Sequence, residues 1–145
     1  MSVWFSPDGG AEAAIVTEIN GAMSYVFGLI NMYQSGPIHT AILNLAALDV
    51  PISLIIDRKM QFLISPRLDE LLAAGVICYW DKHEKSIQSQ YLLIDDMIIF
   101  TGSYRWNEQY NHRYASDLSR ITDMYLYQDY YADWLIHQAH SELIT

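Results

Sequence analysis

The segment 52–56, Ile-Ser-Leu-Ile-Ile, restricts the fold more than any other part of the chain. A strand with one face in water alternates apolar and polar residues, whereas this run is apolar at four of its five positions. Such a pattern is typical of an inner strand that is covered by helices on both faces. Pro51 precedes the run and Asp57 ends it, so its limits are also marked. The run therefore predicts an α/β fold.

The remaining segments alternate in the same sense. Apolar spacing of three and four residues predicts helices at 11–23, 37–48, 65–74 and 124–142. Runs of strand length predict strands at 25–32, 52–56, 76–80, 91–94, 97–101 and 117–122. A chain of 145 residues with this order predicts one domain, 1–145, in which helices sandwich a mixed sheet. In the last helix we expect Leu126, Tyr130, Trp134 and Ile136 to face inward.

Polar residues recur at fixed spacing around the hairpin predicted at 91–101. Gln88 and Gln90 precede its first strand, and Asp95 follows that strand, seven residues after Gln88. Gly102-Ser103 and Arg105 come after the second strand. This spacing resembles the phospholipase D superfamily, which carries His-x-Lys-x4-Asp followed by Gly-Ser-x-Asn.

The resemblance extends over almost the whole chain and is closest to the small single-domain bacterial endonucleases of that superfamily. Segments 5–10, 50–57 and 71–76 match the opening strand, the central strand and a later helix of those nucleases. Asp117 falls where they have a Ser-Glu pair. The resemblance thus implies a phospholipase D-like α/β fold.

Three positions of the motif depart from the family. Gln88 stands at the position of the His nucleophile, Gln90 at that of the Lys, and Arg105 at that of the Asn. The family's His attacks phosphorus and forms a covalent intermediate, which requires a nucleophilic nitrogen. A carboxamide nitrogen is not nucleophilic, because its lone pair is delocalised into the carbonyl. We therefore expect a degenerate site without catalytic activity, in other words a pseudoenzyme.

The replaced residues allow two interpretations each. Gln88 and Gln90 could bind phosphate through neutral donors, or could only fill the former pocket. Arg105 could hold an anion in place of the lost Lys, or could pair with Asp95, Asp96 or Asp117 and close the pocket. Ser103 is expected to keep a local turn role.

No other residue is expected to replace the lost nucleophile. His83 has the His-x-Lys spacing with Lys85, but Gln90 stands seven residues after it and no Asp does. His112 is expected in a loop, and His137 and His140 on the last helix. With a single cysteine and scattered histidines, the sequence predicts no metal site and no cofactor.

The charge balance bears on the partner. The chain has 8 Lys+Arg against 17 Asp+Glu, a net charge of −9. Five of the basic residues fall between 82 and 120, around the motif, and none follows Arg120. An acidic chain rich in Tyr favours a protein partner, such as a nuclease or another nucleic-acid-binding protein, over nucleic acid itself.

The family resemblance also implies a homodimer through the motif face, because two half-sites meet across a twofold axis when each chain carries one motif. The sequence has no apolar run long enough to span a bilayer. Its single cysteine, Cys78, fits the cytoplasm. The favoured function is an inactive, acidic dimer that binds or inhibits a protein. The alternatives are a nucleic-acid-binding module that does not cleave, and a phosphodiesterase with a displaced catalytic residue.

Overall fold

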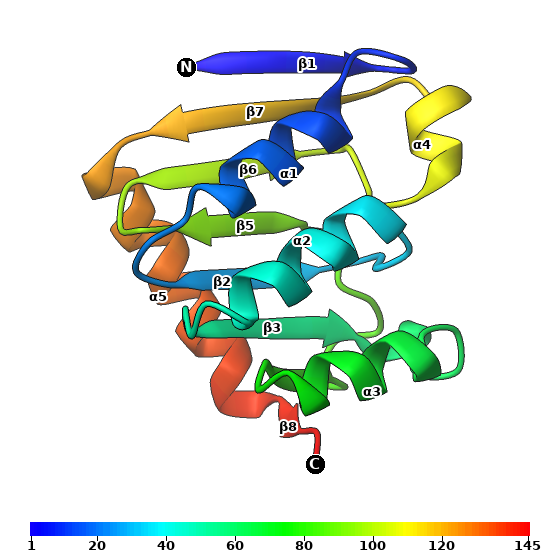
Figure 1. Ribbon diagram of the computed structural model, residues 1–145, viewed down its shortest axis with the longest axis vertical. Helices are drawn as coiled ribbons and strands as arrows, with labels where there is room; N and C mark the ends of the chain where they lie inside the picture. The colour runs from blue at the N-terminus through cyan, green and yellow to red at the C-terminus, as the bar shows by residue number, and fades with distance from the viewer.

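The computed structural model describes residues 1–145 and contains one eight-stranded mixed sheet (Figure 1). The strands are β1 (Ser2–Ser6), β2 (Val26–Ile30), β3 (Ile52–Asp57), β4 (Ile77–Asp81), β5 (Tyr91–Ile94), β6 (Ile98–Gly102), β7 (Ser116–Thr122) and β8 (Glu142–Leu143). The helices are α1 (Ala11–Asn20), α2 (Gly36–Ala46), the 3₁₀ turn η1 (Arg58–Met60), α3 (Ser65–Ala73), α4 (Glu108–His112) and α5 (Met124–His140). The strands follow the order β1-β7-β6-β5-β2-β3-β4-β8 in the sheet.

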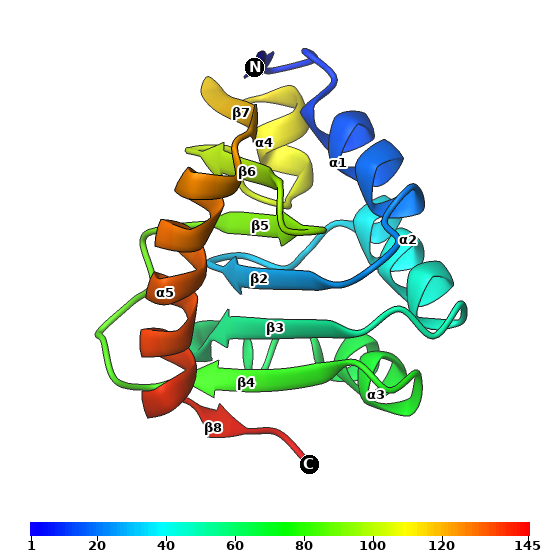
Figure 2. The same cartoon turned by 90° about the vertical axis from the view of Figure 1, so that its left-hand side faces the viewer.

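The helices cover the sheet unequally. Helices α1, α2 and α3 lie on one face, and α5 alone crosses the other (Figure 2). Two apolar clusters follow from this arrangement, one of 27 buried residues beneath α1–α3 and one of 8 beneath α5. Strand β3 shows why its sequence is uniformly apolar: Leu54 and Ile56 pack in the first cluster and Ile55 in the second. The predicted α/β sandwich is confirmed.

The sequence predicted every long element to within a few residues. It missed α4, β8 and the 3₁₀ turn η1, because two to five residues carry too little periodicity to be recognised, and β1 begins earlier than the opening strand expected within 5–10. His112, expected in a loop, lies in the last turn of α4 and donates a hydrogen bond from Nδ1 to Asp8 Oδ1 at 2.8 Å. The expectation that Ile136 faces inward was wrong, since Ile136 is 64% exposed and Tyr127 is the buried residue instead.

Strand directions define two edges of the sheet. Strands β2, β3 and β4 are parallel, and β5 runs antiparallel to β2. The C-terminal ends of β2, β3 and β4 therefore lie beside the start of β5 and the end of β6, an edge that we call the motif edge. The opposite edge holds the Asp95-Asp96 turn between β5 and β6, and we call it the turn edge. The two edges divide the motif residues between them.

Candidate functional site

Gln90 is buried, and its side chain is hydrogen-bonded to the backbone of a neighbouring segment. Its side chain is 5% exposed, and its Oε1 accepts hydrogen bonds from the N–H groups of Asn31 and Met32 at 3.0 and 3.1 Å. These groups follow the C-terminal end of β2, so they have no partner in the strand ladder. The Nε2 of Gln90 is buried without a hydrogen-bond partner. Gln90 thus fills the space predicted for it and satisfies two backbone donors.

Gln88 and Arg105 are linked through the backbone. Gln88 is exposed, and its carbonyl oxygen accepts a hydrogen bond from a guanidinium nitrogen of Arg105. The other terminal nitrogen of Arg105 donates to the carbonyls of Gly102 and Tyr104, at 2.9 and 3.3 Å. Burial lowers the pKa of Arg105 from its ordinary value. Among the interpretations of Arg105, pairing with Asp95, Asp96 or Asp117 was wrong: its bonds go to carbonyls.

Arg105 retains unused hydrogen-bonding capacity. A guanidinium has five N–H donors, and the three carbonyl contacts leave some of them without a protein acceptor. Only Lys82 and Arg120, among the Lys and Arg residues, have a carboxylate within 4.0 Å. The Arg105 cation is therefore fixed in place and not neutralised by a neighbouring acid.

Ser103 and Asp117 form a reciprocal pair. The Ser103 hydroxyl donates to Asp117 Oδ1 at 2.7 Å and accepts from the Asp117 N–H at 3.0 Å. Hydrogen bonds from the Ser103 side chain and backbone lower the pKa of Asp117. Gly102 makes this pair possible, because a Cβ at that position would lie 2.4 Å from the carbonyl oxygen of Asp117, and its φ is +143°. The local turn role predicted for Ser103 is confirmed.

Asp95 lies away from the other motif residues, at the turn edge. Its carboxylate accepts hydrogen bonds from three successive N–H groups, those of Met23, Ser24 and Tyr25, at 2.9, 2.7 and 3.2 Å. Asp95 and Asp96 both have positive φ, as the two central residues of a tight hairpin turn require. The motif thus divides into Gln88, Gln90, Ser103, Arg105 and Asp117 at one edge and Asp95 at the other.

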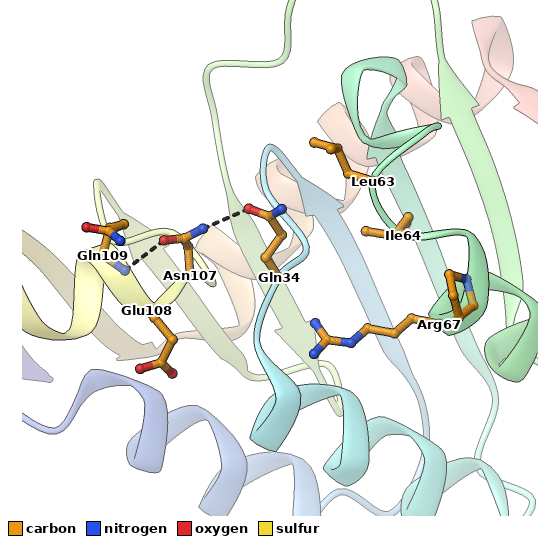
Figure 3. Close-up of a pocket in the computed structure, with 8 residues that line it drawn as sticks. Gln34, Leu63, Ile64, Arg67, Asn107, Glu108 and Gln109 are labelled. Atoms are coloured by element: carbon orange, nitrogen blue, oxygen red, sulfur yellow. Dashed lines mark hydrogen bonds between the residues drawn. The ribbon is translucent and has the colours of Figure 1, made fainter.

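Two open cavities flank the motif edge. One of about 490 Å³ is lined by Gln34, Arg67 and Asn107, among others, and Figure 3 shows the Arg67 guanidinium pointing into it. Asn107 donates to Gln34 Oε1 at 2.7 Å across its floor. The other, of about 460 Å³, lies on the α5 side, next to Gln90 and Gly102. The first cavity was not predicted, because Gln34 and Asn107 are 73 residues apart.

Asp57 is a further residue of this edge to which the sequence analysis assigned no role. It is 1% exposed, and its carboxylate accepts hydrogen bonds from the Ile87 N–H at 2.6 Å and the Ser86 hydroxyl at 3.0 Å. These bonds anchor the segment that carries Gln88. In the sequence, an aspartate directly after a buried apolar strand was the signal that could have indicated this role.

The remaining histidines lie outside the motif residues. His83 stacks on His140 with ring centroids 4.4 Å apart, so its ring packs against the C-terminal end of α5. His39 is buried in α2 beside the Tyr33 hydroxyl, at 2.7 Å, and burial lowers its pKa. His137 and His140 lie on α5, as predicted, but both approach Asp81, which the sequence did not indicate.

The fold and the site place this chain among α/β proteins in which polar side chains gather at one edge of a mixed sheet. Phospholipase D of Rickettsia conorii is 25% identical over 139 residues, which cover 96% of this chain and 70% of that protein. No family model matches the chain. The chain is therefore similar, over nearly its whole length, to proteins of the phospholipase D superfamily.

Solved structures agree in fold. Nuc of Salmonella typhimurium, a phospholipase D family member, superposes with a TM-score of 0.92 at 14% identity, covering 99% of this chain and 96% of its own. NucT of Helicobacter pylori superposes with a TM-score of 0.78 at 15% identity, covering 99% and 98%. The nuclease-like fold that the sequence predicted is thereby confirmed.

Proposed function

We propose that this protein does not hydrolyse phosphodiesters and acts by binding. The observation that carries the proposal is that positions 88 and 90 both hold glutamine. Gln88 offers no nucleophilic nitrogen, and the carboxamide of Gln90 is committed to the backbone of Asn31 and Met32. His83 is held against His140, so it does not supply the missing group.

The test of inactivity is direct. Purified protein should leave single- and double-stranded DNA, RNA and a chromogenic phosphodiester intact, with and without added divalent metal. A Gln88→Ala variant should give the same background rate. Cleavage that copurifies with the chain and disappears in His83→Ala would instead support a phosphodiesterase with a displaced catalytic residue.

The proposed assembly is a homodimer through the motif edge. This edge carries both signs of charge, with Arg58 and Lys85 among its cations and Glu84 and Glu108 among its carboxylates. Across a twofold axis, cations of one copy can face carboxylates of the other, which suits an isologous interface. Light scattering at micromolar concentration should report close to twice the chain mass of 16.7 kDa, and a stable monomer would contradict the proposal.

The proposed partner is a protein with a basic surface, such as a nucleic-acid-processing enzyme. Support comes from α5, which contains no Lys or Arg and exposes Tyr125 at 82% and Ile136 at 64% near Asp129. Aromatic and aliphatic side chains among acids suit a protein interface better than a phosphate backbone. The proposed location is the cytoplasm, which the single buried thiol of Cys78 supports. No helix is long and apolar enough to cross a membrane.

The partner is tested by pull-down from native extract on immobilised wild-type protein, with an Asp129→Lys/Ile136→Asp variant as the matched bait. Proteins retained by wild type and lost with the variant, and eluted by moderate salt, are those that the proposal expects. Equal retention on both baits would remove α5 from the interface.

A second candidate is non-cleaving nucleic-acid binding at the motif edge. Seven of the eight Lys and Arg residues lie in segments that enter or leave the sheet there: Arg58, Lys59, Arg67, Lys82, Lys85, Arg105 and Arg113. Non-specific DNA binders have dissociation constants of roughly 10⁻⁴ to 10⁻⁶ M at physiological salt. Anisotropy with labelled oligonucleotides decides: micromolar binding lost in Arg105→Glu but kept in Arg120→Gln would favour this candidate over a protein partner.

A further inference from the structure

Four side chains from two distant segments meet where β4 ends. Asp81 is the last residue of β4, Glu84 lies in the segment that follows, and His137 and His140 lie in the last turn of α5. Figure 2 shows the C-terminal end of α5 next to the end of β4. Residues three apart on a helix share one face, so both imidazoles point the same way. One potential ligand atom from each of the four residues lies within 4.8 Å of the others.

The distances in this cluster have the dimensions of a metal-binding site. Asp81 Oδ2 lies 2.9 Å from His137 Nδ1 and 3.2 Å from His140 Nε2. Glu84 Oε2 lies 3.8 and 3.3 Å from the same two nitrogens. Four atoms at the corners of a tetrahedron, each ~2.1 Å from a zinc ion, are ~3.4 Å apart. The four carboxylate-to-imidazole distances lie on either side of this value, so the ligand atoms are close to the spacing of a tetrahedral site.

One carboxylate oxygen of the cluster is left without a protein partner. Asp81 is 2% exposed, its Oδ1 accepts the His83 N–H at 3.0 Å, and its Oδ2 is within hydrogen-bond distance of both imidazoles. Glu84 Oε2 is buried without a hydrogen-bond partner, although His140 Nε2 is close. A buried carboxylate oxygen that lacks a partner costs stability. A cation between the four atoms would provide the missing partner.

The surroundings of His137 also match a metal ligand. Its other ring nitrogen, Nε2, lies 3.7 Å from Asp133 Oδ2, and that carboxylate accepts a hydrogen bond from the Tyr91 hydroxyl at 2.7 Å. Imidazoles that bind metals commonly direct their second nitrogen to such an outer carboxylate, which fixes the ring. Here the outer carboxylate is itself held by the first residue of β5. The cluster is thus connected to the strand that follows Gln90.

We propose that Asp81, Glu84, His137 and His140 bind one divalent transition-metal ion, with Zn²⁺ as the best fit. Two imidazoles disfavour Mg²⁺ and Ca²⁺, which prefer oxygen ligands. Four protein ligands complete a tetrahedron and leave no position for a reacting water, so the site is structural. The ion joins α5 to the segment 82–90 and so fixes the approach to Gln88. This site does not depend on the proposed function.

The test is metal titration of the full chain after treatment with a chelator. Calorimetry with Zn²⁺ should give one ion per chain, and Co²⁺ should give the strong visible absorption of a tetrahedral complex. His140→Gln and Glu84→Gln should each weaken Zn²⁺ binding by more than roughly a hundredfold, since loss of an outer partner alone costs ~10–100-fold. Asp133→Asn should fall in that smaller range. His112→Gln, in α4 and in contact with none of the four ligands, is the matched control and should bind as wild type does.

Thermal unfolding separates binding from folding. Zn²⁺ should raise the melting temperature of the wild type and of His112→Gln, because a ligand that binds only the folded state stabilises it. It should leave Glu84→Gln unchanged, and circular dichroism should show that this loop variant is folded. The proposal is overturned if wild-type protein takes up no Zn²⁺ at ~0.1 mM, or if Glu84→Gln and His140→Gln bind it as tightly as wild type.

Discussion

The motif edge and the turn edge hold residues of one sequence motif, and they differ in what those residues contact. At the turn edge, the Asp95 carboxylate accepts hydrogen bonds from three backbone N–H groups. At the motif edge, Ser103 and Asp117 bind each other, and Arg105 donates to backbone carbonyls. Under the proposal of inactivity, the residues at 88, 90 and 105 replace groups that would act on phosphate. Backbone support and the proposed loss of chemistry then lie within the thirty residues 88–117.

Gln90 sharpens this comparison because it is one of the proposed replacements and yet holds backbone. A Lys has only donors, so it would not accept hydrogen bonds from the N–H groups of Asn31 and Met32. The carboxamide oxygen of Gln90 does accept them. Under the proposal, Gln at this position exchanges a cation for better satisfied backbone at the end of β2.

The largest effect is expected at the turn edge. Asp95→Ala removes a carboxylate that accepts from Met23, Ser24 and Tyr25, and it places Ala at a φ of +54°. We expect the free energy of unfolding to fall by about 3 kcal/mol, measured by urea denaturation. Asp95→Asn keeps an acceptor and tolerates positive φ, so it should lose about 1 kcal/mol. Equal losses for the two variants would mean that the hydrogen bonds are not the cause.

The next effect tests the motif edge. Gln90→Ala leaves the N–H groups of Asn31 and Met32 unpaired at a buried position, so the free energy of unfolding should fall by about 2 kcal/mol. Gln88→Ala is the matched control. Its side chain is exposed and should contribute less than about 0.5 kcal/mol. If both variants were equally stable, the two edges would not share the backbone-binding role.

Arg105 gives a smaller and more local effect. Its guanidinium joins the carbonyl of Gln88 to the turn after β6, so Arg105→Ala should free the segment 82–90. Hydrogen exchange in that segment should become about tenfold faster, which corresponds to roughly 1.4 kcal/mol of local opening. Exchange in β5 should not change. Arg113→Ala removes a nearby cation that has no carboxylate partner and should leave exchange as in the wild type.

The sequence predicted what depends on local pattern. The apolar run of β3, the Asp95-Asp96 turn and the Gly102-Ser103 turn are set by neighbours in the chain, and each was found as expected. The contacts of Gln90 with Asn31, and of His137 with Asp81, join residues 59 and 56 positions apart. Periodicity carries no information on such pairs, because they form only when strand order and helix placement are fixed.

The same limit explains two partial errors in the site. The carboxylates expected to pair with Arg105 are close to it in sequence. Asp95 and Asp96, however, lie at the other edge of the sheet, and Asp117 is hydrogen-bonded to Ser103. Arg120 was counted with the cations around the motif, although it pairs with Glu18 at 3.0 Å. Counting charges along the chain does not reveal which edge they occupy.

The smallest expected effect concerns the Ser103–Asp117 pair. Hydrogen bonds from the side chain and backbone of Ser103 lower the pKa of Asp117, so the ionised carboxylate is favoured in the folded protein. A carboxylate with a lowered folded pKa stabilises the fold above its unfolded pKa, near 3.9, and this contribution is lost as pH falls through the folded value. Asp117 is largely accessible to water, so the effect on overall stability is small.

An NMR titration of the Asp117 carboxyl carbon measures this pKa directly. In Ser103→Ala the pKa of Asp117 should rise towards the ordinary value. If the Asp117 pKa stayed low in this variant, backbone donors alone would hold the carboxylate, and the serine at the motif edge would have no electrostatic role.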